Sequence, residues 1–135
     1  MKPIIIVGAG PVGLTAALGL RFYGLPFEVF EEDEGLSSDT KAGTILTRTL
    51  EAFRRYGVVD EVLANALRID EIGDIERATN TARPSVRTEL LADDTRYPFV
   101  VNMPQHHLEP ILHRELHQRH PGAVLLRNKL TGFEN

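Results

Sequence analysis

Three glycines near the N-terminus have the spacing of a loop that binds a phosphate group. Gly8, Gly10 and Gly13 form a G-x-G-x-x-G pattern directly after the apolar run Ile4–Val7. Gly8 permits a tight turn, Gly10 lets a pyrophosphate approach the backbone because it has no Cβ, and Gly13 lets a helix lie close to a strand. The pattern alone has low specificity, so the elements around it must decide whether it binds a dinucleotide.

The segment around the glycines predicts a strand, a loop and a helix. The β-branched run without alternation is typical of a strand buried on both faces, as in a parallel sheet. Pro11 suits the first turn of a helix, where its missing N–H would have had no partner within the helix. The free amides of that turn, among them the amide of Val12, and the positive end of the helix dipole predict an anion site.

A carboxylate follows the next strand, at the place where a dinucleotide fold binds a ribose. Gly24 is expected to end the helix, and Phe27–Phe30 predicts a second short strand. Glu31 comes directly after that strand, about 20 residues beyond the glycines, where its oxygens would accept hydrogen bonds from an adenosine ribose. A carboxylate there would repel a 2′-phosphate, so we expect FAD or NAD rather than NADP.

Three more acidic residues, Glu32, Asp33 and Glu34, crowd the same turn. Acidic loops of this kind are usually solvated surface. Glu32 is still a candidate for the cofactor site, because it would take the place of Glu31 if the strand ended one residue later.

Composition narrows the classes of protein to which the chain can belong. The 135 residues are 42% hydrophobic, enough for one domain with a buried core. A net charge of −4 without a basic run argues against nucleic acid or an anionic membrane as the main partner. The absence of cysteine excludes disulfides, metal–thiolate sites and thiol catalysis. The apolar start is too short for a signal peptide and nothing approaches a membrane span, so we expect a cytoplasmic protein.

Side chains that could themselves perform catalysis do not form a recognisable set. His113, His117 and His120 have the i, i+4, i+7 spacing that can hold a metal on one helix face, but no carboxylate lies in register with them. No serine–histidine–aspartate arrangement and no carboxylate pair is evident. We therefore predict no metal site and no catalytic side chain, and assign the chemistry to a cofactor.

The rest of the chain predicts an α/β fold with an antiparallel insertion. Apolar residues at helical spacing indicate a helix that Gly57 ends, and Asp60 is expected to cap a short helix. Three later segments, in which charged residues are interspersed, indicate an antiparallel sheet with one solvent-exposed face. They lie at residues 69–78, 86–91 and 97–102. Pro104 is expected to start a helix that Pro110 kinks or shortens, and residues 123–126 indicate a third core strand.

Two more segments carry motifs beyond the glycine loop. Lys41 and Ala42 begin the sequence Lys-Ala-Gly-Thr, and Thr-Leu-Glu-Ala-Phe-Arg-Arg-Tyr-Gly follows at residues 49–57. Met-Pro-Gln stands at residues 103–105, shortly before a Leu-Glu pair. Together with the glycine loop and Glu31, these segments resemble the N-terminal part of the class A FAD-dependent aromatic monooxygenases, whose motifs read R-A, T-L-E-L-L-R-R-L-G and P-Q-x-x-L-E-x-x-L.

The resemblance implies a Rossmann-like, glutathione-reductase-type fold, in which a parallel FAD-binding sheet carries an antiparallel β insertion. Residues 1–67 would form the FAD-binding βαβ unit and the helices after it. Residues 68–102 would be a β excursion that belongs to the sheet of the substrate domain. Residues 103–135 would return to the FAD-binding domain as a helix and a strand.

The resemblance also implies a reaction and the residues that bind the cofactor. Lys41 replaces the family's arginine, so it and Ala42 would contact the pyrophosphate without bidentate geometry, and Gln105 would contact the ribityl region of FAD. NAD(P)H would reduce the bound FAD, and dioxygen would then serve to hydroxylate a small phenolic substrate. The cofactor-binding candidates are Gly8, Gly10, Pro11, Val12, Gly13, Glu31, Glu32, Lys41, Ala42 and Gln105.

Enzymes of this family continue far beyond 135 residues. We therefore expect a fragment that is not catalytically complete. The first strand of a doubly wound sheet lies at its centre, yet the chain supplies no later neighbour for Ile4–Val7, which would be left as an exposed apolar edge. The alternatives are another FAD-dependent oxidoreductase, such as a halogenase or a reductase, and a non-catalytic dinucleotide-binding module. Homo-oligomerisation is left open.

Overall fold

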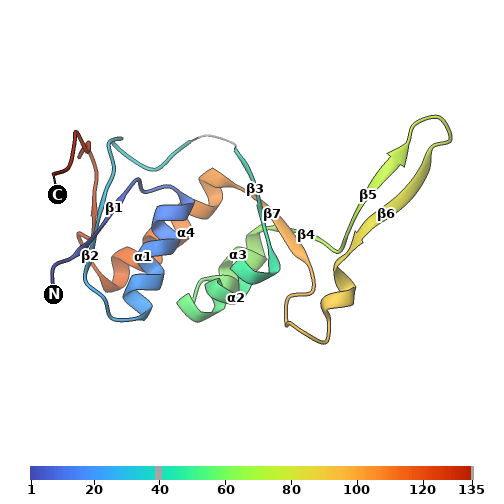
Figure 1. Ribbon diagram of the computed structural model, residues 1–135, viewed down its shortest axis with the longest axis horizontal. Helices are drawn as coiled ribbons and strands as arrows, with labels where there is room; N and C mark the ends of the chain where they lie inside the picture. The colour runs from blue at the N-terminus through green and yellow to red at the C-terminus, as the bar shows by residue number, and fades with distance from the viewer. Residues whose placement is uncertain (39–40, 135) are drawn as a thin grey trace.

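The glycine loop joins a strand to a helix in the computed structural model, which describes residues 1–38 and 41–134 (Figure 1). Strand β1 (Ile4–Val7) precedes helix α1 (Pro11–Phe22), and strand β2 (Phe27–Phe30) follows it. β1 and β2 pair in parallel, with Ile4 opposite Phe27 and Val7 opposite Phe30. β8 (Val124–Leu125) pairs in parallel with the other edge of β2, so the strand order is β1-β2-β8.

A second, antiparallel sheet lies beyond the helices. Its strand order is β3-β7-β4, from β3 (Ala42–Ile45), β7 (Val100–Pro104) and β4 (Leu67–Ile69). Helices α2 (Thr47–Tyr56), α3 (Val59–Asn65) and α4 (Gln105–Arg119) complete the layer between the two sheets. Figure 1 shows both termini beside the parallel sheet, with α1 and α4 next to it and the antiparallel strands on the far side of the helices. The predicted α/β fold with an antiparallel insertion is confirmed.

A hairpin projects from the end of the molecule opposite the termini (Figure 1). It consists of β5 (Glu71–Glu76) and β6 (Thr81–Arg87), followed by a 3₁₀ turn, η1 (Thr88–Leu91). Every residue of β5 is exposed, so the hairpin has no buried face among the described residues. The expectation of one solvent-exposed and one buried face is therefore wrong for this hairpin.

The predicted strand boundaries within the insertion are also wrong. The segment 69–78 is divided between β4 and β5, the segment 86–91 is the end of β6 followed by η1, and the third strand begins at Val100 instead of residue 97. Thr88 causes the break at the base of the hairpin, because its N–H and its hydroxyl both donate to the carbonyl of Asp70, over 3.2 and 2.6 Å.

Two helix predictions differ in detail from the structure. Asp60 was expected to cap α3, but the cap residue is Val58. Asp60 lies in the first turn instead, where its negative charge interacts favourably with the helix dipole. Pro110 lies inside α4, which is 15 residues long from Gln105 to Arg119, so the proline does not shorten the helix. The kink at Pro110 stays a prediction. The helix continues past Pro110 because an apolar stripe holds it against the core, with Leu108, Ile111, Leu112 and Leu116 all buried.

The first strand is exposed where the sequence predicted burial on both faces. Within the described part of the chain, β1 pairs with β2 alone, and Ile4, Ile5 and Val7 are 42%, 49% and 56% exposed. The expected apolar edge at Ile4–Val7 is therefore confirmed. No helix among the described residues is long and apolar enough to cross a lipid bilayer.

Candidate functional site

The glycine loop leaves the N-terminus of α1 open. Gly8 has a φ of +96°, a left-handed conformation that favours glycine, and its N–H donates to the carbonyl of Phe30 over 2.7 Å. Gly10 is the cap residue of α1, which has neither a side-chain cap nor an acidic residue in its first turn. The amides of this turn, where Pro11 and Val12 lie, therefore face no anion from their own helix.

Gly10 and Gly13 have very different surroundings. A Cβ on Gly13 would stand 2.0 Å from the carbonyl oxygen of Gly8 and 3.3 Å from Ile6 Cγ2, so only a hydrogen atom fits between helix and loop. A Cβ on Gly10 would meet nothing closer than Oε1 of Glu109, at 3.9 Å. The backbone is thus closely packed at Gly13 and open at Gly10, which is where a pyrophosphate needs room.

Glu31 stands at the end of β2 with both carboxylate oxygens fixed. Oε1 accepts from the backbone N–H of Asp33 over 3.0 Å, and Oε2 accepts from that of Ala9 over 2.6 Å. These two donors, Asp33 foremost, hold the pKa of Glu31 below its usual range. An ionised acceptor therefore lies directly beside the glycine loop.

The other acidic residues of the turn pair with the C-terminal segment. Glu32 Oε2 lies 2.7 Å from Nζ of Lys129, whose pKa this contact raises, and Glu34 lies 3.1 Å from Arg127. Glu32 is an exposed residue that already has a cationic partner. The structure thus separates Glu31, which contacts the loop, from Glu32, which does not.

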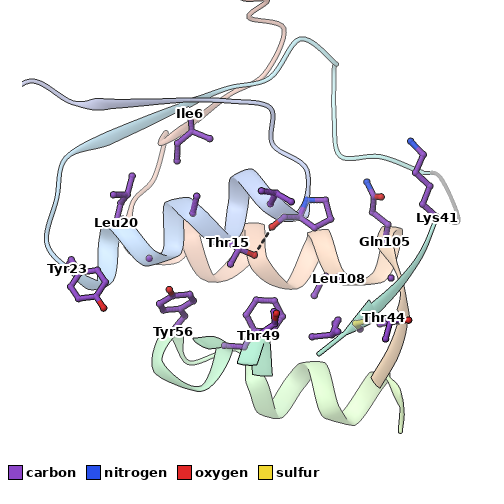
Figure 2. A pocket seen from close by; sticks show the side chains of 18 of the residues that line it. Ile6, Thr15, Leu20, Tyr23, Lys41, Thr44, Thr49, Tyr56, Gln105 and Leu108 are labelled. Atoms are coloured by element: carbon purple, nitrogen blue, oxygen red, sulfur yellow. Dashed lines mark hydrogen bonds between the residues drawn. The ribbon is translucent and has the colours of Figure 1, made fainter. Parts of the chain in front are cut away.

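A cavity of about 810 Å³ runs along α1 toward β3 and α2 (Figure 2). Pro11, Val12, Lys41 and Gln105 line it, with Lys41 and Gln105 close together at one end. The N–H of Gln105 donates to the carbonyl of Lys41 over 2.9 Å, which joins two predicted site residues that are far apart in the sequence. The apolar part of the lining consists of side chains such as Ile6, Leu20, Phe53, Met103 and Leu108.

Lys41, which lines the cavity, lies directly before the first strand of the antiparallel sheet. Ala42 is the first residue of β3 and lies opposite Pro104 in the register with β7. Gln105 follows that proline as the first residue of α4. The pairing of β3 with β7 therefore brings together the Lys-Ala and Pro-Gln motifs.

Glu109 is a site residue to which the sequence analysis gave no role. It is 1% exposed, and its Oε1 accepts from Nε2 of Gln105 over 2.6 Å. The signal in the sequence is the acid that follows Leu108 within an apolar stripe, one helical turn after Gln105.

The histidines of α4 do not form a metal centre. The rings of His113 and His117 stack with centroids 5.9 Å apart, and burial, with the nearby His117, lowers the pKa of His113. Across residues 1–38 and 41–134, no group of three or more histidine, aspartate or glutamate side chains is placed to hold a metal ion.

Known proteins are similar to this chain in both sequence and fold. The family model described as "FAD binding domain" matches residues 1–135. Para-nitrophenol 4-monooxygenase of Pseudomonas sp. (strain WBC-3) is 25% identical over 115 residues, which cover 85% of this chain and 28% of that protein. Rifampicin monooxygenase of Rhodococcus hoagii is 30% identical over 129 residues, which cover 96% of this chain and 25% of that protein.

The crystal structure of p-nitrophenol 4-monooxygenase PnpA from Pseudomonas putida DLL-E4 matches with a TM-score of 0.80 and 25% identity, over 94% of this chain and 32% of that one. The flavin-dependent monooxygenase PieE, solved with FAD and substrate, matches with a TM-score of 0.76 and 28% identity, over 93% of this chain and 23% of that one. The chain thus spans about a quarter of the length of these curated relatives.

Proposed function

Because this chain belongs to the FAD-binding domain family, we propose that it binds FAD within a monooxygenase that hydroxylates a phenolic substrate with NAD(P)H and dioxygen. The observation that carries the proposal is the open space beside Gly10, at the uncapped N-terminus of α1. Helix amides and the helix dipole favour a pyrophosphate in that space. The relatives named above are monooxygenases, and one acts on a nitrophenol by its name.

The other cofactor-binding residues extend from this point in two directions. Glu31, ionised and next to the loop, supports an assignment to the adenosine ribose, whereas the ion pair of Glu32 with Lys129 argues against a direct role for Glu32. On the other side, Lys41, which lines the cavity, is assigned to the pyrophosphate by its positive charge. Ala42, the next residue along the chain and the first of β3, is assigned to the same part of the cofactor. Gln105 is assigned to the flavin half of FAD.

The chemistry of the proposed reaction divides between cofactor and protein. Bound FAD supplies electron transfer from NAD(P)H and the activation of dioxygen. The protein binds and orients the cofactor through the residues above, and the apolar lining of the cavity excludes water. A reaction that consumes NAD(P)H supports a cytoplasmic location, and the antiparallel segment 68–102 is assigned to the sheet of the substrate domain.

The test uses the purified protein that carries these residues. The expected result is a yellow protein that contains FAD, and whose oxidation of NADH or NADPH accelerates when phenol or p-nitrophenol is added, with a hydroxylated product. A colourless protein that takes up no FAD would overturn the proposal. Bound FAD with chlorination or bromination of the phenol, or with NAD(P)H oxidation that no phenol accelerates, would point to a halogenase or a reductase.

Replacing Glu31 by alanine tests the ribose assignment. Loss of a charged hydrogen bond should weaken FAD binding by about 1.5–3 kcal/mol, which is more than ten-fold. Replacing Glu32 by alanine removes only the exposed pair with Lys129 and should leave the affinity unchanged. Flavin fluorescence titration measures both constants. If the Glu32 variant lost affinity and the Glu31 variant did not, the ribose assignment would be wrong.

A further inference from the structure

The side chain of Glu109 is a buried carboxylate whose two oxygens contact two different parts of the proposed site. Oε1 accepts from the amide nitrogen of Gln105 over 2.6 Å, and Oε2 accepts from the backbone N–H of Ser37 over 2.9 Å. Glu109 is only 1% exposed, and burial of a charged group is unfavourable unless its hydrogen bonds are satisfied. A single side chain on α4 therefore ties its own first turn to the chain that leads from β2 toward Lys41.

The first of these bonds determines which way the amide of Gln105 is oriented. Nε2 of Gln105 is the atom that donates to Glu109, so Gln105 turns its NH₂ group toward the carboxyl group. The carbonyl oxygen of Gln105 is then the end that is left for the cavity, which this residue lines. An amide carbonyl accepts hydrogen bonds from hydroxyl groups, and the ribityl chain of FAD carries hydroxyl groups.

The position of Glu109 relative to Gly10 argues that it does not itself bind the pyrophosphate. Its Oε1 lies 3.9 Å from where a Cβ of Gly10 would stand, so its negative charge is close to the space assigned to the pyrophosphate. A carboxylate and a pyrophosphate that lie close together repel each other, and the repulsion is stronger in a partly buried site. Glu109 therefore opposes pyrophosphate binding slightly, and its benefit must lie toward the other half of the cofactor.

We propose that Glu109 is a positioning residue, which fixes the amide of Gln105 so that its carbonyl oxygen accepts a hydrogen bond from the ribityl chain of FAD. This inference rests on the proposed function. It makes a prediction that a merely structural role does not make. Removal of the charge at position 109 should weaken the binding of FAD but not the binding of ADP, which has the adenosine and pyrophosphate of FAD without the ribityl chain.

The test compares the FAD and ADP affinities of the wild-type protein with those of the Glu109→Gln variant by calorimetry. We expect about a ten-fold loss for FAD, the usual effect of one charge-assisted hydrogen bond, with ADP affinity unchanged or slightly higher. Gln105→Ala should lose FAD affinity to the same extent, and the double variant should lose no more than either single one. Equal losses of FAD and ADP affinity in Glu109→Gln would overturn the proposal, as would additive losses in the double variant.

Glu115→Gln is the matched control, because it removes another carboxylate from α4 that bonds Arg21 at a distance from the loop. It should change neither affinity. A wild-type protein that binds ADP but not FAD would refute the proposed function. This result is distinct from a failure of the Glu109 proposal, in which the wild-type protein binds FAD and the Glu109→Gln variant loses FAD and ADP affinity equally.

If Glu109→Gln does not fold, NMR of the wild-type protein tests the proposal instead. The side-chain NH₂ of Gln105 and the amide of Ser37 should give NMR signals shifted downfield and protected from exchange, as donors to a carboxylate are. Signals of Gln105 at the position of a solvated glutamine would contradict the proposal.

Discussion

Replacing Gly10 by valine should abolish FAD binding and leave the fold in place. Gly10 has φ −70° and ψ −179°, an extended conformation that any residue can adopt, and a Cβ there would meet nothing within 3.9 Å. A valine at a helix cap position destabilises the helix by about 1 kcal/mol, which a folded domain tolerates. The side chain would occupy the space assigned to the pyrophosphate, so we expect an affinity loss of at least about 100-fold, or ~2.7 kcal/mol.

Flavin fluorescence titration measures the affinity of this variant, and circular dichroism follows its secondary structure and unfolding. Gly132→Val is a suitable control, since a Cβ at that exposed glycine would meet no atom within 4 Å. It should bind FAD like the wild-type protein. Unchanged flavin binding by Gly10→Val would show that the pyrophosphate does not lie at this helix.

Replacing Gly13 by alanine should have the opposite effect, a loss of stability as the primary change. The new Cβ would stand 2.0 Å from the carbonyl oxygen of Gly8 and 3.1 Å from its carbonyl carbon, so helix and loop must separate. Overpacking of this kind destabilises a protein by about 1–3 kcal/mol and sometimes more. Because the contact here is with backbone, which cannot rotate away, we expect the upper end of that range.

Gly19→Ala provides the comparison within the same helix. Its Cβ would approach the hydroxyl of Tyr56 at 3.0 Å, the end of a side chain that can shift. In a helix interior, alanine is also more favourable than glycine by about 1 kcal/mol. Thermal unfolding should therefore show a small change for Gly19→Ala and a large fall in midpoint for Gly13→Ala. Equal midpoints would mean that the close contact at Gly13 is absent in solution.

The sequence alone was sufficient to predict the part of the site whose residues follow one another along the chain. The glycine loop, the helix after it and Glu31 follow one another within a single βαβ unit, so spacing determines their arrangement. The family resemblance assigned Lys41 and Gln105 to the same cofactor, but no contact between them was predicted. That contact depends on the pairing of β3 with β7, which spacing does not reveal.

Other features could not be predicted because tertiary contacts decide them. The ends of β5 and β6 are set by the bonds between Thr88 and Asp70, and an exposed hairpin gives no alternating pattern to read. α4 continues past Pro110 because its apolar stripe is buried. Glu109 stood in a motif of the family, but its role depends on two donors from different segments, Gln105 and Ser37.

A crystal structure of the protein with FAD tests the central claim most directly. We expect pyrophosphate oxygens at about 2.7–3.2 Å from backbone amides in the first turn of α1, beside Gly10. The adenosine ribose should contact Glu31, and the flavin half should extend toward Gln105. A cofactor whose pyrophosphate lies away from the N-terminus of α1, or whose ribose does not contact Glu31, would contradict the account.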